Sequence, residues 1–343
     1  MARYDRIAPL TSPARDHAFP GWPVLRDLEG QDRDIDVCRR ARLRFLALRP
    51  VCRLLGRDPA SVSNGSYSKQ IEAVREELGS LSLRDVERAR VTRFLRHIED
   101  RDPRRLVTAL LEFAEQANDA GHVYAAQEYA LTANALSPNA ADDLIARIVQ
   151  GDVEQQTDPA ASLERHWNEL RLTEDVSARA RILERLGRGL MSLRQFTPAD
   201  RCFALVAQRA TDLSVRARAR AAHALLAALM GEAAVYRERR AALLNDDAEW
   251  APDPRVAASI NIDLAHGSLV VGDSDFARDH LRIAIAVARR HNYGAMLKRA
   301  ESILTALEQN TDVLLQPQQQ STTETTQRIA AQIELLDLPT PAN

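Results

Sequence analysis

Residues 180–203 decide the fold and read ARILERLGRGLMSLRQFTPADRCF. The large apolar residues of this stretch recur at helical spacing: Leu183, Leu186, Leu190, Phe196 and Phe203. The small residue Gly187 stands among them, and Ala199 follows twelve positions later. Two antiparallel helices approach closely only where small residues meet, so we expect a tight helix pair with Gly187 facing Ala199 across it.

The same arrangement recurs on both sides of this stretch. Two further copies start near residues 107 and 258, about two repeat lengths away in each direction. Weaker copies are expected at 141–179 and at 217–244, where the turn falls at Gly231. The small and apolar positions that define the two clear copies are Leu110, Phe113, Ala114, Gly121, Ala126, Ala133 and Pro138, and then Leu264, Ala265, Gly272, Ala277, Leu281 and Ala284.

The spacing resembles the tetratricopeptide repeat, whose 34 residues follow the pattern W-x2-L-G-x2-Y, then A-x3-F, then P. The resemblance covers about residues 105–310, roughly 60% of the chain, and tryptophan is absent from its usual place in every copy. It implies a tetratricopeptide-like α-α superhelix, or solenoid, whose first helices line a concave groove. An irregular helical bundle is the alternative.

The composition agrees with an all-α fold. Of 343 residues, 45% are hydrophobic and only 5% are aromatic, and helix formers such as Ala, Leu, Arg and Glu are frequent. No run of β-branched residues alternates with the period of a strand. The formal net charge of −2 gives no overall preference for a polyanion such as nucleic acid.

Four regions are expected along the chain. They are an irregular N-terminal arm at 1–31, an N-terminal helical region at 32–100, helical repeats at 101–310, and a polar linker with a short amphipathic segment at 311–343. The last segment carries the apolar stripe Ile329, Ile333 and Leu336. Helix starts are expected where a capping oxygen precedes proline: Asp102-Pro103, Asp158-Pro159, Thr197-Pro198 and Asp253-Pro254.

The sequence contains no motif of a known catalytic or cofactor site. Phosphate loops, dinucleotide-binding glycines, H-E-x-x-H and G-x-S-x-G are all absent. Asp273, Asp275, Asp279 and His280 are grouped, but a solvated turn and helix start explains them better than a metal site. We therefore expect no enzyme, no cofactor and no metal, although a site assembled from distant residues stays open.

The expected compartment is the cytoplasm. The N-terminus lacks the apolar core of a signal peptide, and no stretch approaches 18 apolar residues. The three scattered cysteines, Cys38, Cys52 and Cys202, suit buried thiols better than a disulfide framework.

Arginine runs are the sequence feature with chemical content. They cover residues 39–53, 179–194 and 216–220. By the resemblance, Arg181, Arg185 and Arg188 lie on the first helix of the best copy, and Arg218 has the matching place in the next copy. These four are the candidate partner-binding residues, since each guanidinium can hold a carboxylate in a bidentate pair. Solvated helix faces are the simpler interpretation of any one run.

The leading functional hypothesis is a non-enzymatic scaffold or adaptor that presents a repeat groove to a protein or peptide, either an acidic segment or a chain carboxy-terminus. The alternative is a transcriptional or signalling regulator in which residues 1–100 contact DNA and the repeats sense a ligand. A nucleic-acid partner is the less favoured of the two, because the chain lacks a basic domain with aromatic residues for stacking.

Overall fold

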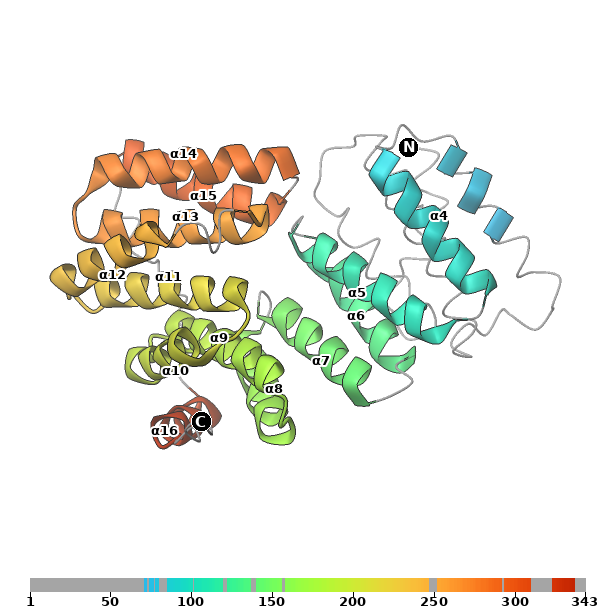
Figure 1. Cartoon of the computed structure of the whole chain (residues 1–343), viewed down its shortest axis with the longest axis horizontal. Coiled ribbons are helices and arrows are strands. Elements are labelled where there is room, and N and C mark those ends of the chain that lie inside the picture. The colour runs from blue at the N-terminus through green and yellow to red at the C-terminus, as the bar shows by residue number, and fades with distance from the viewer. Residues whose placement is uncertain are drawn as a thin grey trace. The chain divides into compact units, whose positions relative to one another are not determined.

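The computed structural model describes residues 71–72, 74–76, 78–79, 85–100, 102–119, 122–136, 140–155, 158–246, 252–291, 293–309 and 323–336. All regular structure in these ranges is helical (Figure 1). This confirms the predicted all-α class, whereas the superhelix stays a prediction. The expected arm at 1–31, the helices before residue 71 and the arginines at 39–53 lie outside the described residues.

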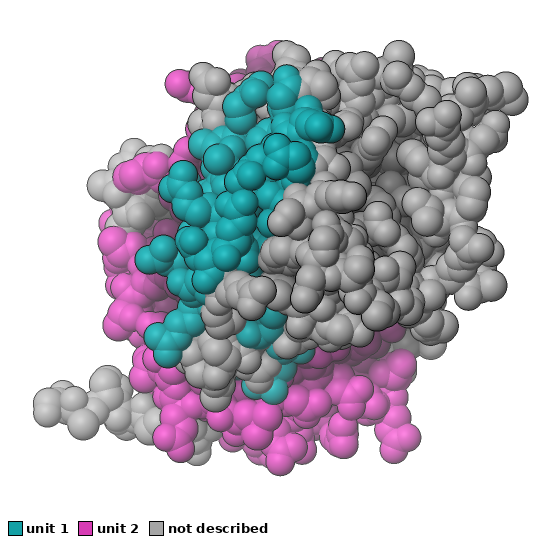
Figure 2. Space-filling view, turned by 90° about the vertical axis from the view of Figure 1, so that its right-hand side faces the viewer, with its two compact units in different colours: residues 1–153 teal, residues 154–343 magenta. Residues whose placement is uncertain are grey.

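The chain forms two compact units, residues 1–153 and 154–343 (Figure 2). The division falls inside the region 101–310 that the sequence assigns to one series of repeats. No described helix combines the length and the apolar character that crossing a bilayer requires.

The first unit contains helical residues at 71–72, 74–76 and 78–79 and four longer described helices: α4 (Asp85–Glu99), α5 (Pro103–Asp119), α6 (Val123–Leu136) and α7 (Ala140–Glu154). Its aliphatic core includes Ile71, Val74 and Leu78, whose spacing of three and four residues is that of one helix face. Phe94 meets Phe113 edge to face, with 5.2 Å between the ring centroids. The predicted helix pair with turn Gly121 corresponds to α5 and α6, which pack together.

The second unit contains nine described helices: α8 (Pro159–Leu172), α9 (Val176–Ser192), α10 (Phe196–Arg209), α11 (Leu213–Leu229), α12 (Ala233–Asn245), α13 (Pro254–Val270), α14 (Ser274–His291), α15 (Gly294–Glu308) and α16 (Glu324–Glu334). The pairs α9–α10, α11–α12 and α13–α14 match three predicted copies, and each pair is in contact. In addition, α9 contacts α11, α11 contacts α13, and α13 contacts α15. The helices α9, α11, α13 and α15 therefore form a series in which each helix packs against the next.

Glycine allows two of these helices to approach an aromatic ring. A Cβ atom added at Gly187 would lie 2.7 Å from Cε1 of Phe203, and one added at Gly267 would lie 2.5 Å from Cε2 of Tyr236. The ring that meets Gly187 thus belongs to Phe203, one helical turn beyond the predicted neighbour Ala199. The predicted turns at Gly231 and Gly272 are also present, with φ angles of 84° and 83° that favour glycine.

Three of the four predicted helix starts are correct and one is wrong. The carboxylates of Asp158 and Asp253 accept backbone N–H bonds from the first turns of α8 and α13, and Asp102 does the same for Arg105 N. Helix α10, however, begins at Phe196, two residues before Pro198, and Thr197 does not cap it. Proline is tolerated there because N–H groups of the first turn have no partner within the helix.

The C-terminal amphipathic segment folds back on its own unit. Helix α16 contacts α8 and α10, and Ile329, Ala330 and Ile333 are buried. The Arg201 side chain donates to the Leu336 carbonyl oxygen at 2.9 Å. The helix starts at Glu324, after a cap by Thr323, so it includes the last three residues of the polar stretch 316–326, which reads QPQQQSTTETT and which the sequence predicts as a linker. The remaining linker residues, 311–322, lie outside the described residues.

Candidate partner-binding site

Three of the four predicted arginines meet around one carboxylate. Arg185 and Arg188 from α9 and Arg218 from α11 all form ion pairs with Glu184, whose side chain is completely buried. Arg181 does not join them. Its side chain is 52% exposed, and it pairs with Asp212, the N-cap of α11, at 3.2 Å.

Arg188 connects Glu184 to a second buried carboxylate. Its Nε donates to Glu184 Oε1 at 2.6 Å, and its Nη2 donates to Asp263 Oδ2 at 3.0 Å. Asp263 lies on α13 and is also completely buried, and its other oxygen accepts from Arg299 of α15 at 3.3 Å. We call these six residues the arginine–carboxylate network: Glu184, Arg185, Arg188, Arg218, Asp263 and Arg299. The network spans α9, α11, α13 and α15.

Charge pairing keeps the buried groups ionised. Burial opposes ionisation of Glu184, but the positive charges of Arg185, Arg218 and Arg188 hold the pKa of this carboxyl well below its usual range. Burial likewise disfavours the charged form of Arg188, yet Asp263 and Glu184 raise the pKa of its guanidinium above the usual value. Both partners therefore remain charged at neutral pH.

Arg218 is the least satisfied member of the network. Its Nη2 lies 3.6 Å from Glu184 Oε2, beyond hydrogen-bond distance, and its side chain is only 17% exposed. Its buried Nε has no hydrogen-bond partner among the described residues. Burial lowers the pKa of Arg218, and the nearby charges of Arg185, Arg188 and Arg255 lower it further against the attraction of Glu184. An additional anion near Arg218 would relieve this unfavourable environment.

His266 lies next to the network on α13. It is 7% exposed, and neither ring nitrogen has a hydrogen-bond partner among the described residues. Burial, helped by the charge of Arg299, lowers the pKa of His266 to about 4. The imidazole is therefore neutral at pH 7 and adds no charge to the network.

Sequence reasoning missed Asp263, Arg299 and His266. Asp263 did carry a signal, since it is the only acidic residue of α13 and stands between the apolar residues Ile262 and Leu264. Such a residue costs free energy when it is buried without a cationic partner. The identity of that partner was not readable, because Arg188 lies 75 residues away in sequence.

Other residues that the sequence singled out have structural contacts. Arg179 donates to the Leu170 and Thr173 carbonyl oxygens at the end of α8, both at 3.0 Å. Of the grouped residues, Asp273, Asp275 and Asp279 pair with arginines, and His280 bonds to Asn261. In the part of the chain that the structure describes, no three His, Cys, Asp or Glu side chains lie close enough to hold a metal ion. Cys202 is a buried free thiol whose pKa is raised by burial.

The arginine–carboxylate network can hold an anion but has no group placed as a nucleophile beside a base. Its chemistry is therefore recognition of negative charge by guanidinium groups. Comparison with protein-family models gives no match, and comparison with curated proteins gives none either.

Proposed function

We propose that this chain is a non-enzymatic interaction module that binds an acidic protein or peptide segment at the arginine–carboxylate network. The observation that carries the proposal is Arg218, a largely buried guanidinium whose one ion-pair distance is 3.6 Å and whose Nε lacks a hydrogen-bond partner among the described residues. A carboxylate from a partner would supply the hydrogen bonds that Glu184 does not.

The contacts of the other network residues indicate which arginines are available to bind a partner's carboxylate. Arg188 is committed to two buried carboxylates, so its contribution is to hold α9 and α13 together. Arg218 and Arg299 are better placed, since Arg299 is 46% exposed and forms one bond with Asp263 at 3.3 Å. Arg181, on the same helix as Arg185 and Arg188, adds a solvated positive charge. The four helices that carry the network lie side by side, because α9 contacts α11, α11 contacts α13, and α13 contacts α15. An extended segment could therefore contact several of them.

The test uses a synthetic peptide of alternating Glu and Ser residues, with the same peptide containing Gln in place of Glu as a neutral control. The unmodified chain should bind the acidic peptide, with affinity that falls as salt rises. Arg218→Met should weaken this binding roughly tenfold or more. It should lower the melting temperature much less than Arg188→Ala does, because Glu184 keeps its ion pairs with Arg185 and Arg188.

Arg282→Met is the matched control, because Arg282 is an exposed arginine on α14 that pairs with Asp279. It should leave peptide affinity unchanged. Equal binding of the acidic and neutral peptides, or full affinity in Arg218→Met, would reject the proposal.

A further inference from the structure

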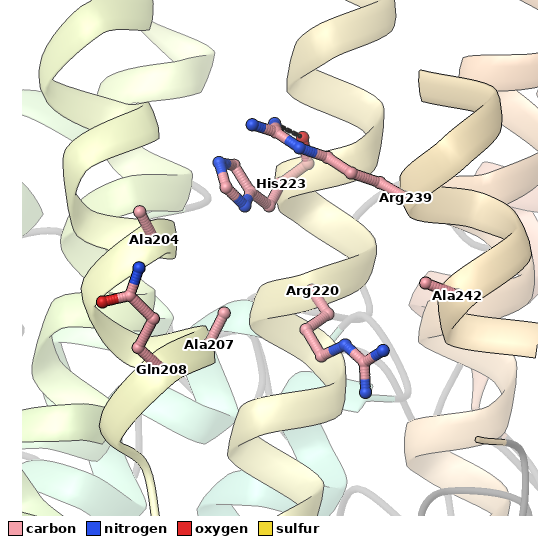
Figure 3. Close-up of a pocket in the computed structure, with 7 residues that line it drawn as sticks. All are labelled: Ala204, Ala207, Gln208, Arg220, His223, Arg239 and Ala242. Atoms are coloured by element: carbon pink, nitrogen blue, oxygen red, sulfur yellow. Dashed lines mark hydrogen bonds between the residues drawn. The ribbon is translucent and has the colours of Figure 1, made fainter. Parts of the chain in front are cut away.

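A separate cavity of about 270 Å³ lies among α10, α11 and α12 (Figure 3). Its polar lining comes from all three helices: Gln208, Arg220, His223 and Arg239. None of these residues belongs to the arginine–carboxylate network. The cavity is therefore a candidate binding site separate from the network.

The lining combines hydrogen-bond donors with small apolar walls. Two guanidinium groups, an imidazole and an amide face the space, and no acidic side chain is among the lining residues. The remaining walls are the methyl groups of Ala204, Ala207 and Ala242. Donors of this kind favour an anion, and the methyl groups favour an apolar portion on the same ligand.

Contacts with Asp200 hold two of the donors in place. Its Oδ1 lies 2.8 Å from His223 Nε2 and 3.5 Å from Arg239 Nη1. Arg239 Nη1 also donates to the His223 carbonyl oxygen at 2.9 Å, so it reaches from α12 across to α11 (Figure 3). The hydrogen bond from His223 holds the pKa of Asp200 below its usual value, so this carboxylate is ionised and His223 Nε2 carries a hydrogen. The donors are thus positioned before any ligand arrives.

The remaining arginine is anchored from the opposite side. Arg220 Nη2 donates to Asp246 Oδ2 at 2.8 Å, just beyond the end of α12. The Asp246 side chain is half exposed. Exposed pairs of this kind contribute little stability, so a ligand anion can share or replace Asp246 at small cost.

We propose that this cavity binds a small organic carboxylate, with its carboxylate held by Arg220 and Arg239 and its short hydrocarbon chain against the three alanines. The volume lies just below the usual range of about 300–1,000 Å³ for ligand pockets, which favours a small ligand. The inference does not depend on the proposed peptide binding.

The test is titration of the full chain with butyrate, followed by two-dimensional NMR of backbone amides. Inorganic phosphate and butylamine serve as comparison probes, the first without an apolar chain and the second with the opposite charge. Butyrate should cause saturable shifts in α10, α11 and α12, with weaker binding of phosphate and none of butylamine. Arg239→Gln should weaken butyrate binding roughly tenfold.

Steric variants distinguish the cavity from other cationic surfaces. Ala242→Phe should abolish butyrate binding by filling the space, whereas Ala241→Phe, at an exposed neighbouring position outside the lining, should bind like the parent. Arg218→Met should also bind butyrate normally, which separates this inference from the proposed function. Absence of saturable shifts, tighter binding of phosphate than of butyrate, or full affinity in Ala242→Phe would overturn it.

Discussion

The arginine–carboxylate network and the two glycine–aromatic contacts lie on the same helices, but they depend on the sequence in different ways. Helix α9 carries Glu184 and Gly187, and α13 carries Asp263 and Gly267. The Gly187–Phe203 contact joins neighbours in one helix pair. The Arg188–Asp263 bond joins helices that are 75 residues apart in sequence. The sequence pattern singles out Gly187 as a point of close approach, whereas the partner of Arg188 can be identified only in the assembled structure.

Substitutions in the arginine–carboxylate network should lower the free energy of unfolding more than substitutions at the glycine–aromatic contacts. Arg188→Ala should lower the free energy of unfolding by about 3–5 kcal/mol, because it leaves two completely buried carboxylates with fewer counter-charges. Urea unfolding followed by circular dichroism measures the change. A loss below about 1 kcal/mol would mean that the other arginines satisfy both carboxylates without Arg188.

Acid should destabilise the folded chain through the buried His266 on α13. His266 has a pKa of about 4 in the folded chain and an ordinary value of 6.5. The unfolded chain therefore binds a proton first as pH falls, and stability should drop between pH 6.5 and 4 by roughly 3 kcal/mol. His280, whose pKa burial also lowers, contributes with the same sign.

The variant His266→Leu should flatten this part of the pH profile, since neither ring nitrogen makes a hydrogen bond with a described residue that leucine would lose. His291→Leu, at an exposed position, is the control and should keep the slope of the parent. Thermal unfolding at several pH values provides the measurement. An unchanged slope in His266→Leu would show that other groups cause the acid sensitivity.

Substitution at a glycine–aromatic contact should cause an intermediate loss of stability. Gly267→Ala should destabilise the chain by about 1–2 kcal/mol, because overpacking exceeds the gain in helix propensity. Tyr236 cannot easily move away, since its hydroxyl bonds to the Leu264 carbonyl oxygen and to Ser268, both at 2.6 Å. The matched control is Gly189→Ala. Its new methyl would lie 3.4 Å from Leu163, an ordinary contact, so we expect no loss of stability.

Substitution of Arg181 should cause the smallest loss of stability, because Arg181 is not part of the arginine–carboxylate network. Its exposed pair with Asp212 contributes less than about 1 kcal/mol, and Asp212 still caps α11 without it. Arg181→Ala should therefore melt within a few degrees of the parent. A loss as large as that of Arg188→Ala would contradict the division between buried and solvated arginines on α9.

Much of the helical layout could be predicted from the sequence because its signals are local. Caps at Asp158 and Asp253 and turns at Gly231 and Gly272 depend on a few neighbouring residues. The wrong start at Thr197 shows the limit of such signals, since Pro198 fits any position of the first turn. The atoms nearest to a Cβ added at Gly187 belong to the ring of Phe203, a contact that the spacing of small residues did not predict.

The C-terminal segment illustrates a choice between alternatives that the sequence left open. The apolar stripe predicted a short helix, but the stripe itself does not say whether it finds a groove. In the structure α16 covers α8 and α10 of its own unit. Leu335 remains 82% exposed beside it, so burial selects Ile329 and Ile333 and not every apolar residue of the segment.

The sequence by itself determined the all-helical class, three helix starts and the turns at Gly231 and Gly272, because backbone hydrogen bonds and apolar periodicity act over a few residues. Tertiary structure decided the role of the arginines. Arg181 and Arg188 lie on the same helix, seven residues apart, yet one is solvated and the other joins two buried carboxylates. The cost of burying a charge depends on which partners arrive from elsewhere in the fold, and the sequence pattern of one helix does not contain them.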